Sequence, residues 1–254
     1  MPSSFDLSSA AAAQRLADWC AIGHPGEALL YLRNGASPLR LGHRTSAEEW
    51  PLPAHWHGLL AARSGLRVVQ GAAQCWQVPR PRLVKLQFFV DQALGYPVAI
   101  VRTQPLATLA TGVEQLTSHS ALEHWYLSQA VHRPEASQAF ARHLRGGESY
   151  QLVAYLHRHA ACNCTLRTLA ERYGVCVSHF RRLCHQALGA GSRSELRDWR
   201  AAIALLDIVE RRAPLTDVAL RCGYASSSHF ARDIRQRLGV MPSSLLDITR
   251  LAQP

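Results

Sequence analysis

The most constraining feature of this 254-residue chain is a pattern that occurs twice between residues 165 and 240. Both copies place an apolar pair, a glycine, a His-Phe pair and a Leu-Gly pair in the same order. The matching positions are Leu169-Ala170, Gly174, His179-Phe180 and Leu188-Gly189 in the first copy and Val218-Ala219, Gly223, His229-Phe230 and Leu238-Gly239 in the second. Each copy predicts a short helix, a turn in which glycine adopts positive φ, and a second helix, which is the layout of a helix-turn-helix.

The second helix of each copy is expected to bury one face and expose the other. The expected inward positions are Phe180, Leu183, Cys184, Ala187 and Leu188 in the first copy and Phe230, Ile234 and Leu238 in the second. The expected outward positions are Ser178, His179, Arg181, Arg182 and His185, then Ser227, Ser228, His229, Arg232, Asp233 and Arg235. A charged helix face is usually only solvated, but in the second helix of a helix-turn-helix it indicates contact with DNA bases.

A longer helix is predicted between the two copies, from about Ser194 to Arg212. Its expected apolar face consists of Leu196, Trp199, Ile203, Leu206 and Val209. Pro214 ends this helix and begins the next one. Because major grooves on one face of B-DNA recur every ~34 Å, a rigid spacer of this length allows one chain to enter two successive grooves.

Residues 150–250 resemble the DNA-binding domain of the AraC/XylS family of bacterial transcription regulators. The second copy carries the resemblance in Leu215, Val218-Ala219, Gly223-Tyr224, Ser228, Phe230, Arg232 and the segment Leu238-Gly239-Val240-Met241-Pro242-Ser243. The resemblance implies base contacts through Ser178, Arg181 and Arg182 in the first copy and through Ser227, Ser228 and Arg232 in the second. Ile234, Met241 and Leu245 depart from the family pattern at packing positions.

The charge distribution agrees with a DNA-binding carboxy-terminal part. From Tyr150 onward there are 15 Arg and no Lys against 8 acidic residues, whereas residues 1–149 carry 13 basic and 10 acidic residues. Such a surplus attracts phosphates, and the arginine fork pairs well with guanine, although a GC-rich genome would also favour arginine. No apolar run approaches the ~20 residues of a membrane helix, so a cytoplasmic protein with reduced cysteines and no disulfide is expected.

The amino-terminal part is predicted to contain short strands followed by helices. The expected strands include Leu66–Val69, Leu83–Val90 and Val98–Val101. From Pro105 to His143 the pattern predicts two amphipathic helices that divide near Thr117-Ser118. These helices serve either as a dimer interface, as the family resemblance implies, or as core. Gly146-Gly147 is the expected linker.

Three other groups of residues resemble metal-binding or enzymatic motifs, but each lacks residues that its motif requires. His55-Trp56-His57 is not followed by further ligands at the spacing of a metal-binding barrel. His157-Arg158-His159 with Cys162 and Cys164 lacks the Cys-x-x-Cys spacing of a zinc site. A zinc-dependent methyl-acceptor module needs four cysteines, and the amino-terminal half has only Cys20 and Cys75. We therefore expect no enzyme activity, no catalytic residue, no metal and no cofactor.

The predicted fold class is α+β. A divergent domain of short strands and helices, residues 1–145, is expected before an all-α domain, residues 146–254, with helix-turn-helix units at about 165–189 and 214–239. The candidate DNA-binding residues are Ser178, His179, Arg181, Arg182, Ser227, Ser228, His229, Arg232 and Arg235.

The resemblance implies a transcriptional activator that binds double-stranded promoter DNA and RNA polymerase. The short, divergent amino-terminal half favours the branch of the family that activates type III secretion and virulence genes. That branch uses a secretion chaperone as coactivator, and a homodimer formed through the amino-terminal helices is also expected. The alternatives are control by a small-molecule effector and a protein that titrates a partner without recognising a DNA sequence.

Overall fold

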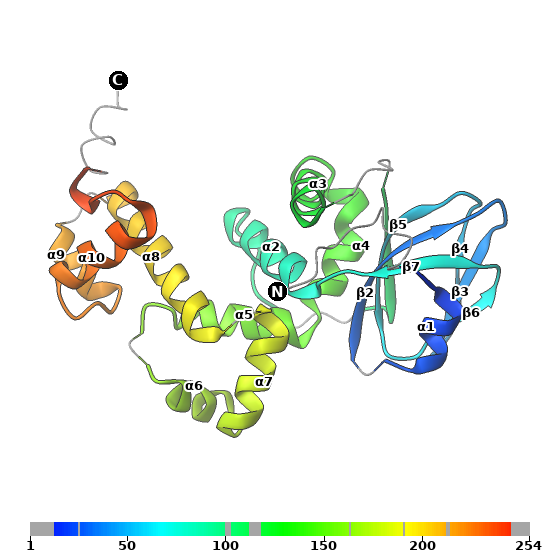
Figure 1. Ribbon diagram of the computed structural model, residues 1–254, viewed down its shortest axis with the longest axis horizontal. Helices are drawn as coiled ribbons and strands as arrows, with labels where there is room; N and C mark the ends of the chain where they lie inside the picture. Colours follow the sequence, from blue (N-terminus) through cyan, green and yellow to red (C-terminus); the bar gives the residue numbers. More distant parts are fainter. Residues whose placement is uncertain are drawn as a thin grey trace. The chain divides into compact units, whose positions relative to one another are not determined.

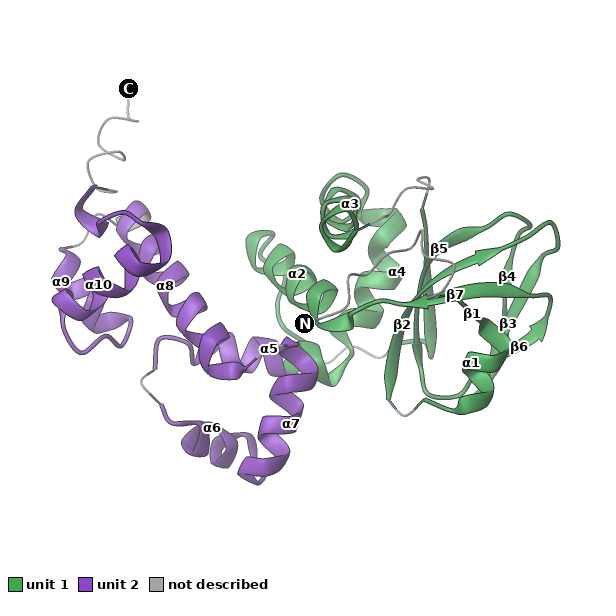
Figure 2. Ribbon diagram, in the orientation of Figure 1, with its two compact units in different colours: residues 1–151 green, residues 152–254 purple. Residues whose placement is uncertain are grey.

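The computed structural model describes residues 13–24, 26–99, 103–111, 118–162, 164–189, 191–211 and 214–244. The chain forms two compact units, Met1–Gln151 and Leu152–Pro254, which Figure 2 colours separately. Unit 1 mixes strands and helices, and unit 2 is helical in its described part. The α+β prediction is therefore confirmed.

Unit 1 contains two antiparallel sheets, one with strand order β1-β7-β2-β5-β8 and one with order β4-β3-β6. The strands are β1 (Gln14–Arg15), β2 (Glu27–Asn34), β3 (Leu39–His43), β4 (Ser46–Leu52), β5 (His57–Arg63), β6 (Leu66–Gln70), β7 (Ala73–Gln77) and β8 (Leu106–Ala110). The helices are α1 (Leu16–Ile22), α2 (Arg80–Ala93), α3 (His119–His132), α4 (Pro134–Arg145) and α5 (Glu148–Arg158), whose last residues belong to unit 2.

A leucine-rich core lies between the two sheets. Strand β2 contributes Leu30 and Leu32, which are fully buried, and β3 contributes Leu39 and Leu41. The alternate residues of β2, such as Tyr31, point to the opposite face because side chains alternate along a strand. Helix α4 packs against β8 and β5 and contacts α2 and α3 (Figure 1). Consecutive residues of β2 and of β5 are buried, so both strands are covered on both faces.

Two segments of unit 1 differ from the sequence prediction. Residues 83–90 form part of α2 and not a strand, because a short apolar run fits either element until its buried face is known. Residues 106–110 form β8 and not a helix, since they pair with β5 from Gly58 opposite Ala110 to Ala62 opposite Leu106. The strand at Leu66–Val69 is confirmed as part of β6.

Other predicted elements of this region are only partly found. Val98 and Ala99 are not in a strand, while Ile100, Val101, Val113 and Leu116 lie outside the described residues. A helix does begin after Ser118, whose Oγ accepts the Ala121 amide at 3.1 Å, but it ends at His132, and Pro134 begins α4.

Gly146-Gly147 is a tightly packed turn between α4 and α5, not a linker. Gly147 is buried, and a Cβ atom there would lie 2.7 Å from a carboxylate oxygen of Glu27. Glu27 forms an ion pair with Arg80 at this position, so the turn is tied to both β2 and α2. The sequence signal of two adjacent glycines therefore reflects close packing here.

His143 on α4 should make unit 1 less stable in acid. Burial, reinforced by the Arg80 charge, lowers the pKa of His143 to about 4, although Nδ1 lies 3.2 Å from the Gln104 carbonyl oxygen. The unfolded chain takes up a proton near pH 6.5 and the folded chain does not, so stability falls as the pH drops from 6.5 towards 4. We expect a loss of about 2 kcal/mol between pH 7 and pH 5.

Urea unfolding at the two pH values measures this loss. His143→Phe removes the titrating group and should reduce the difference between pH 7 and pH 5. An equal pH dependence in both proteins would assign the acid sensitivity to another group.

Unit 2 contains the remaining helices: α6 (Leu166–Tyr173), α7 (Val177–Leu188), α8 (Ser192–Arg211), α9 (Leu215–Arg221) and α10 (Ser227–Leu238). Figure 1 shows α8 running from the α6–α7 pair to the α9–α10 pair. None of the helices in the described ranges combines the length and the apolar character needed to span a membrane.

Candidate nucleic-acid interface

The first helix-turn-helix consists of α6 and α7. Thr165 caps α6 by accepting the Thr168 amide at 3.1 Å, and Gly174 ends it with φ of +84°. The inward positions predicted for α7 are confirmed, because Phe180, Leu183, Cys184, Ala187 and Leu188 are all buried. Tyr155 of α5 supports this core by contacting the ring of Phe180 and donating its hydroxyl to the Leu169 carbonyl at 2.8 Å.

The second helix-turn-helix consists of α9 and α10. Gly223 follows α9 with φ of +75°, and Ser226 caps α10 by accepting the His229 amide at 3.1 Å. Phe230 and Ile234 are buried against the apolar face of α9, as predicted. Leu238 is 50% exposed, so its predicted inward position is wrong.

The outward faces of α7 and α10 carry the candidate DNA-binding residues. Exposed candidates are Ser178, Arg181 and Arg182 on α7 and Ser228, His229, Arg232 and Arg235 on α10; His179 and Ser227 are half-buried. The His229 ring packs against Tyr224 with a centroid distance of 5.6 Å. Both outward faces thus present polar and cationic groups, from the first two turns of α7 and from all three turns of α10.

Two sets of arginines in unit 2 differ in whether they have an internal partner. Arg197, Arg200, Arg221 and Arg237 are bound to carboxylates or carbonyls of the unit. Arg181, Arg182, Arg232 and Arg235 make no ion pair or hydrogen bond with any residue in the described ranges. The second set is therefore available for an external anion. Arg158 and Arg193, which lie outside the two outward faces, are also exposed without a partner in the described ranges.

Asp233 was predicted to point outward, and this prediction is wrong. Its side chain is buried and accepts hydrogen bonds from Tyr224 Oη at 3.0 Å and from Arg197 Nη2 at 3.0 Å. Arg237, one turn further along α10, places Nε 3.2 Å from the same carboxylate. A buried carboxylate is stable only with such partners, so the ion pairs override the helical pattern.

The Asp233 cluster positions α10 and was not found from the sequence. The available signal was the extra residue in the second turn, which changes the offset between the copies from 49 to 50. Tyr224 lies within that longer turn. In the first copy, the position that corresponds to Asp233 is occupied by Leu183. The two helix pairs therefore share a backbone plan but fix their second helices by different chemistry.

Tyr224→Phe should lower the free energy of unfolding of unit 2 by about 1–3 kcal/mol, because a hydrogen bond to a buried carboxylate is lost. Burial and the Asp233 charge raise the pKa of the Tyr224 hydroxyl, which therefore stays a proton donor at neutral pH. Chemical denaturation of the full chain measures the loss. Tyr96→Phe is the matched control because the Tyr96 hydroxyl makes no hydrogen bond with a described residue; equal stability of both variants would refute the assignment.

Helix α8 connects the helix pairs over 20 residues, or ~30 Å. Its buried face is Trp199, Ala201, Ala204 and Ile208, while Leu206 is 59% exposed and Val209 is 49% exposed. The helix was predicted correctly, but part of its expected apolar face points to solvent. Ala201, Ala204 and Ile208 of this face belong to one buried cluster with Val218 and Ala219 of α9 and Phe230 and Ile234 of α10.

The histidines and cysteines before α6 are held by unit 2 itself. His157 packs on the ring of Trp199 at 5.9 Å, and His159 Nδ1 lies 2.8 Å from the Tyr155 carbonyl. Cys162 and Cys164 form a disulfide, contrary to the expectation that the cysteines are reduced. The two cysteines are separated by one residue and their Cα atoms are 5.2 Å apart, whereas the expectation of reduced cysteines rests on the cellular compartment alone. The described ranges contain no cluster of three or more potential metal ligands.

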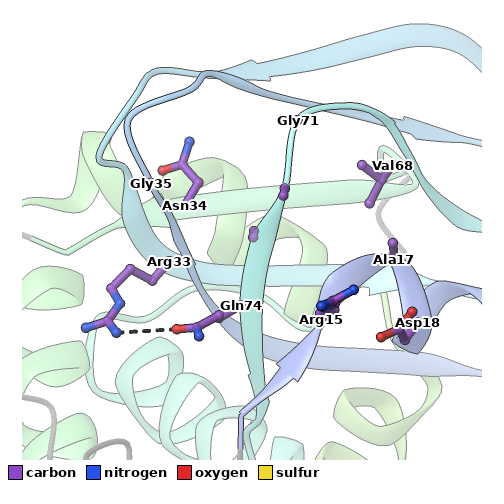
Figure 3. Close-up of a pocket in the computed structure, with 11 residues that line it drawn as sticks. Arg15, Ala17, Asp18, Arg33, Asn34, Gly35, Val68, Gly71 and Gln74 are labelled. Atoms are coloured by element: carbon purple, nitrogen blue, oxygen red, sulfur yellow. Dashed lines mark hydrogen bonds between the residues drawn. The ribbon is translucent and has the colours of Figure 1, made fainter. Parts of the chain in front are cut away.

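A groove of about 630 Å³ lies in the described part of unit 1. It is lined by β1 and the start of α1 on one side, and by the last residues of β2 and the first residues of β7 on the other. Figure 3 shows Arg33 bonded to Gln74 on one side and Arg15 and Asp18 on the other. Asn34, also in the lining, is buried and its Oδ1 has no donor among the described residues.

Residues 169–247 match the model of a helix-turn-helix domain. With its two helix pairs on a connecting helix, the carboxy-terminal unit is a helix-turn-helix domain of the AraC type. The chain is 44% identical to the invasion protein InvF of Salmonella typhimurium over 130 residues, and 40% identical to the transcriptional regulator MxiE of Shigella flexneri over 112 residues.

These matches cover 51% and 43% of this chain, and only 60% of InvF and 53% of MxiE. The transcriptional regulator ExsA of Pseudomonas aeruginosa is 22% identical over 86% of this chain and 76% of its own length. Among solved structures, ToxT of Vibrio cholerae matches 88% of this chain at 10% identity with a TM-score of 0.37, too low for a comparison of the folds.

Proposed function

We propose that this protein is a sequence-specific DNA-binding activator of virulence genes, in particular of type III secretion genes. The observation that carries the proposal is the group of exposed arginines without internal partners on the outward faces of α7 and α10. These helices lie in residues 169–247, which match the helix-turn-helix domain model. Residues 146–254 act as the DNA-binding domain and residues 1–145 as the regulatory and dimerisation domain.

In the proposed complex α7 and α10 enter two successive major grooves. Ser178, Arg181 and Arg182 on α7 and Ser227, Ser228 and Arg232 on α10 contact bases, while His179, His229 and Arg235 contact bases or phosphates. The ~30 Å length of α8 supports this arrangement because major grooves on one face of DNA recur every ~34 Å. The bound protein then recruits RNA polymerase.

Arg232→Ala should weaken binding to the target promoter by about 1–3 kcal/mol, since a guanidinium contact to a base edge is lost. Fluorescence anisotropy with promoter DNA and with random DNA measures the loss. Affinity for random DNA should change little because phosphate contacts dominate there. Unchanged promoter affinity would remove Arg232 from the contact set, and equal affinity of the native protein for both DNAs would favour a titrating protein.

The proposed regulator is a secretion chaperone that binds unit 1. Three apolar side chains on or beside α2 and α3 are exposed: Leu94 by 53%, Leu127 by 37% and Val131 by 46%. In the proposal they form the docking surface for the chaperone, or for a second copy of the chain. A reporter assay in a heterologous bacterium tests this. Activation only with the chaperone supports coactivation, and activation without it contradicts it.

A small-molecule effector is the second candidate regulator. The groove beside Arg15, Asp18 and Arg33 supports it, because its volume is within the ~300–1,000 Å³ typical of ligand sites. Reporter activity that needs no chaperone but is lost in Arg33→Ala would favour the effector.

A further inference from the structure

Cys162 and Cys164 are placed where three helices of unit 2 meet. They lie in the turn between α5 and α6, and Cys164 directly precedes Thr165, the residue that caps α6. Helix α8 holds the same turn, because Arg200 donates Nε to the Ala160 carbonyl at 3.0 Å and Nη2 to the Cys162 carbonyl at 3.2 Å. The conformation of this turn therefore determines how α6 begins.

The two cysteines have the geometry and surroundings of a reactive pair. Their Cα atoms are 5.2 Å apart, within the range that a disulfide requires, and both residues are partly exposed. Arg172 of α6 places Nη1 3.6 Å from Cys164 Sγ. A guanidinium at this position stabilises a thiolate, which is both the attacking and the leaving form of a cysteine.

We infer that Cys162 and Cys164 are a reversible dithiol–disulfide site whose reaction partner is a low-molecular-weight disulfide such as glutathione disulfide. The Cys164 thiolate attacks one sulfur of that disulfide and releases one thiolate, leaving a mixed disulfide on Cys164. The Cys162 thiolate then attacks Cys164 Sγ and releases the second thiolate. Two protein thiols are oxidised, two protons are lost and the external disulfide is reduced to two thiols.

Closing the disulfide restricts the turn and orders α6. Thr165 Oγ1 accepts the Thr168 amide in the first turn of α6, and a cross-link one residue before Thr165 limits the conformations in which this cap is lost. Helix α6 in turn packs on α7 through Leu169 and Ala170, which are buried. Oxidation therefore favours the arrangement in which α7 is held for binding, and the effect on DNA affinity rests on the proposed function.

The chemistry is tested by intact mass spectrometry of the full chain after treatment with glutathione disulfide. The starting protein carries Cys176→Ser and Cys20→Ala, which remove the exposed thiol and the other partly exposed thiol among the described residues. We expect the loss of two hydrogen atoms and no glutathione adduct, with Cys162 and Cys164 joined in the same peptide. Cys162→Ser should instead retain one glutathione on Cys164. Two thiols that stay reduced, or that each keep a glutathione, would overturn the inference.

The structural effect is tested by hydrogen exchange of the oxidised and reduced forms. Amides of α6 should exchange at least several-fold more slowly in the oxidised form, and amides of α2 in unit 1 should not change. Equal exchange in α6 would overturn the link to this helix, even if the disulfide forms.

DNA binding of the two forms completes the test. Promoter affinity should be several-fold higher in the oxidised form, and a Cys162→Ala/Cys164→Ala variant should not respond to oxidant. Equal affinities would refute the regulatory role. Absence of specific binding in both forms would refute the proposed function, while the mass and exchange measurements would still decide the dithiol site.

Discussion

Asp91→Ala should lower the free energy of unfolding of unit 1 by about 3–5 kcal/mol, because it leaves a guanidinium without its counter-charge in a buried site. The Asp91 side chain is completely buried and accepts two hydrogen bonds from Arg145, at 2.8 and 2.6 Å. It also accepts the Tyr150 hydroxyl at 2.6 Å and the Gln87 amide at 2.7 Å. One carboxylate therefore joins α2 to the end of α4 and the start of α5.

Urea denaturation of the full chain, monitored in unit 1 by exchange or fluorescence, measures the effect of Asp91→Ala. Glu123→Ala is the control, because it breaks an ion pair between α3 and α2 that is largely exposed, with Arg82 at 2.8 Å. Exposed pairs contribute only about 0–1 kcal/mol. Similar losses in the two variants would show that the Asp91 cluster does not hold the helices together.

Simultaneous Arg181→Ala and Arg232→Ala substitutions should weaken promoter binding by about 2–6 kcal/mol, the sum of two independent losses. The two arginines lie on different second helices, and neither has a partner among the described residues. Additive losses require that α7 and α10 both contact the same DNA molecule. Anisotropy titrations of the two single variants and the double variant measure the coupling between them.

Arg82→Ala provides the charge-matched control, since it removes an exposed arginine from unit 1 and leaves unit 2 unchanged. It should reduce promoter affinity far less than either single substitution. If the double variant binds no more weakly than Arg232→Ala alone, only the second helix-turn-helix contacts the promoter.

The sequence alone was least informative in unit 1. Residues 83–90 and 106–110 are short apolar segments, and their periodicity does not distinguish a strand from a helix. The pairing of β8 with β5 and the packing of α4 on that sheet decide the outcome. The Asp91 cluster was equally hidden, because Asp91 is separated from its hydrogen-bond partners by up to 59 residues in the chain.

In unit 2 the sequence by itself determined both helix-turn-helix units, the positive φ of Gly174 and Gly223 and the buried face of α7. These features are local: helical periodicity, turn glycines and repetition act over a few residues. The tertiary structure alone decided that Asp233 points inward, that Leu206 points outward and that Cys162 lies beside Cys164. The orientation of Asp233 depends on which partner reaches it in space, such as Arg197 36 residues away, and a periodic pattern contains no information about such partners.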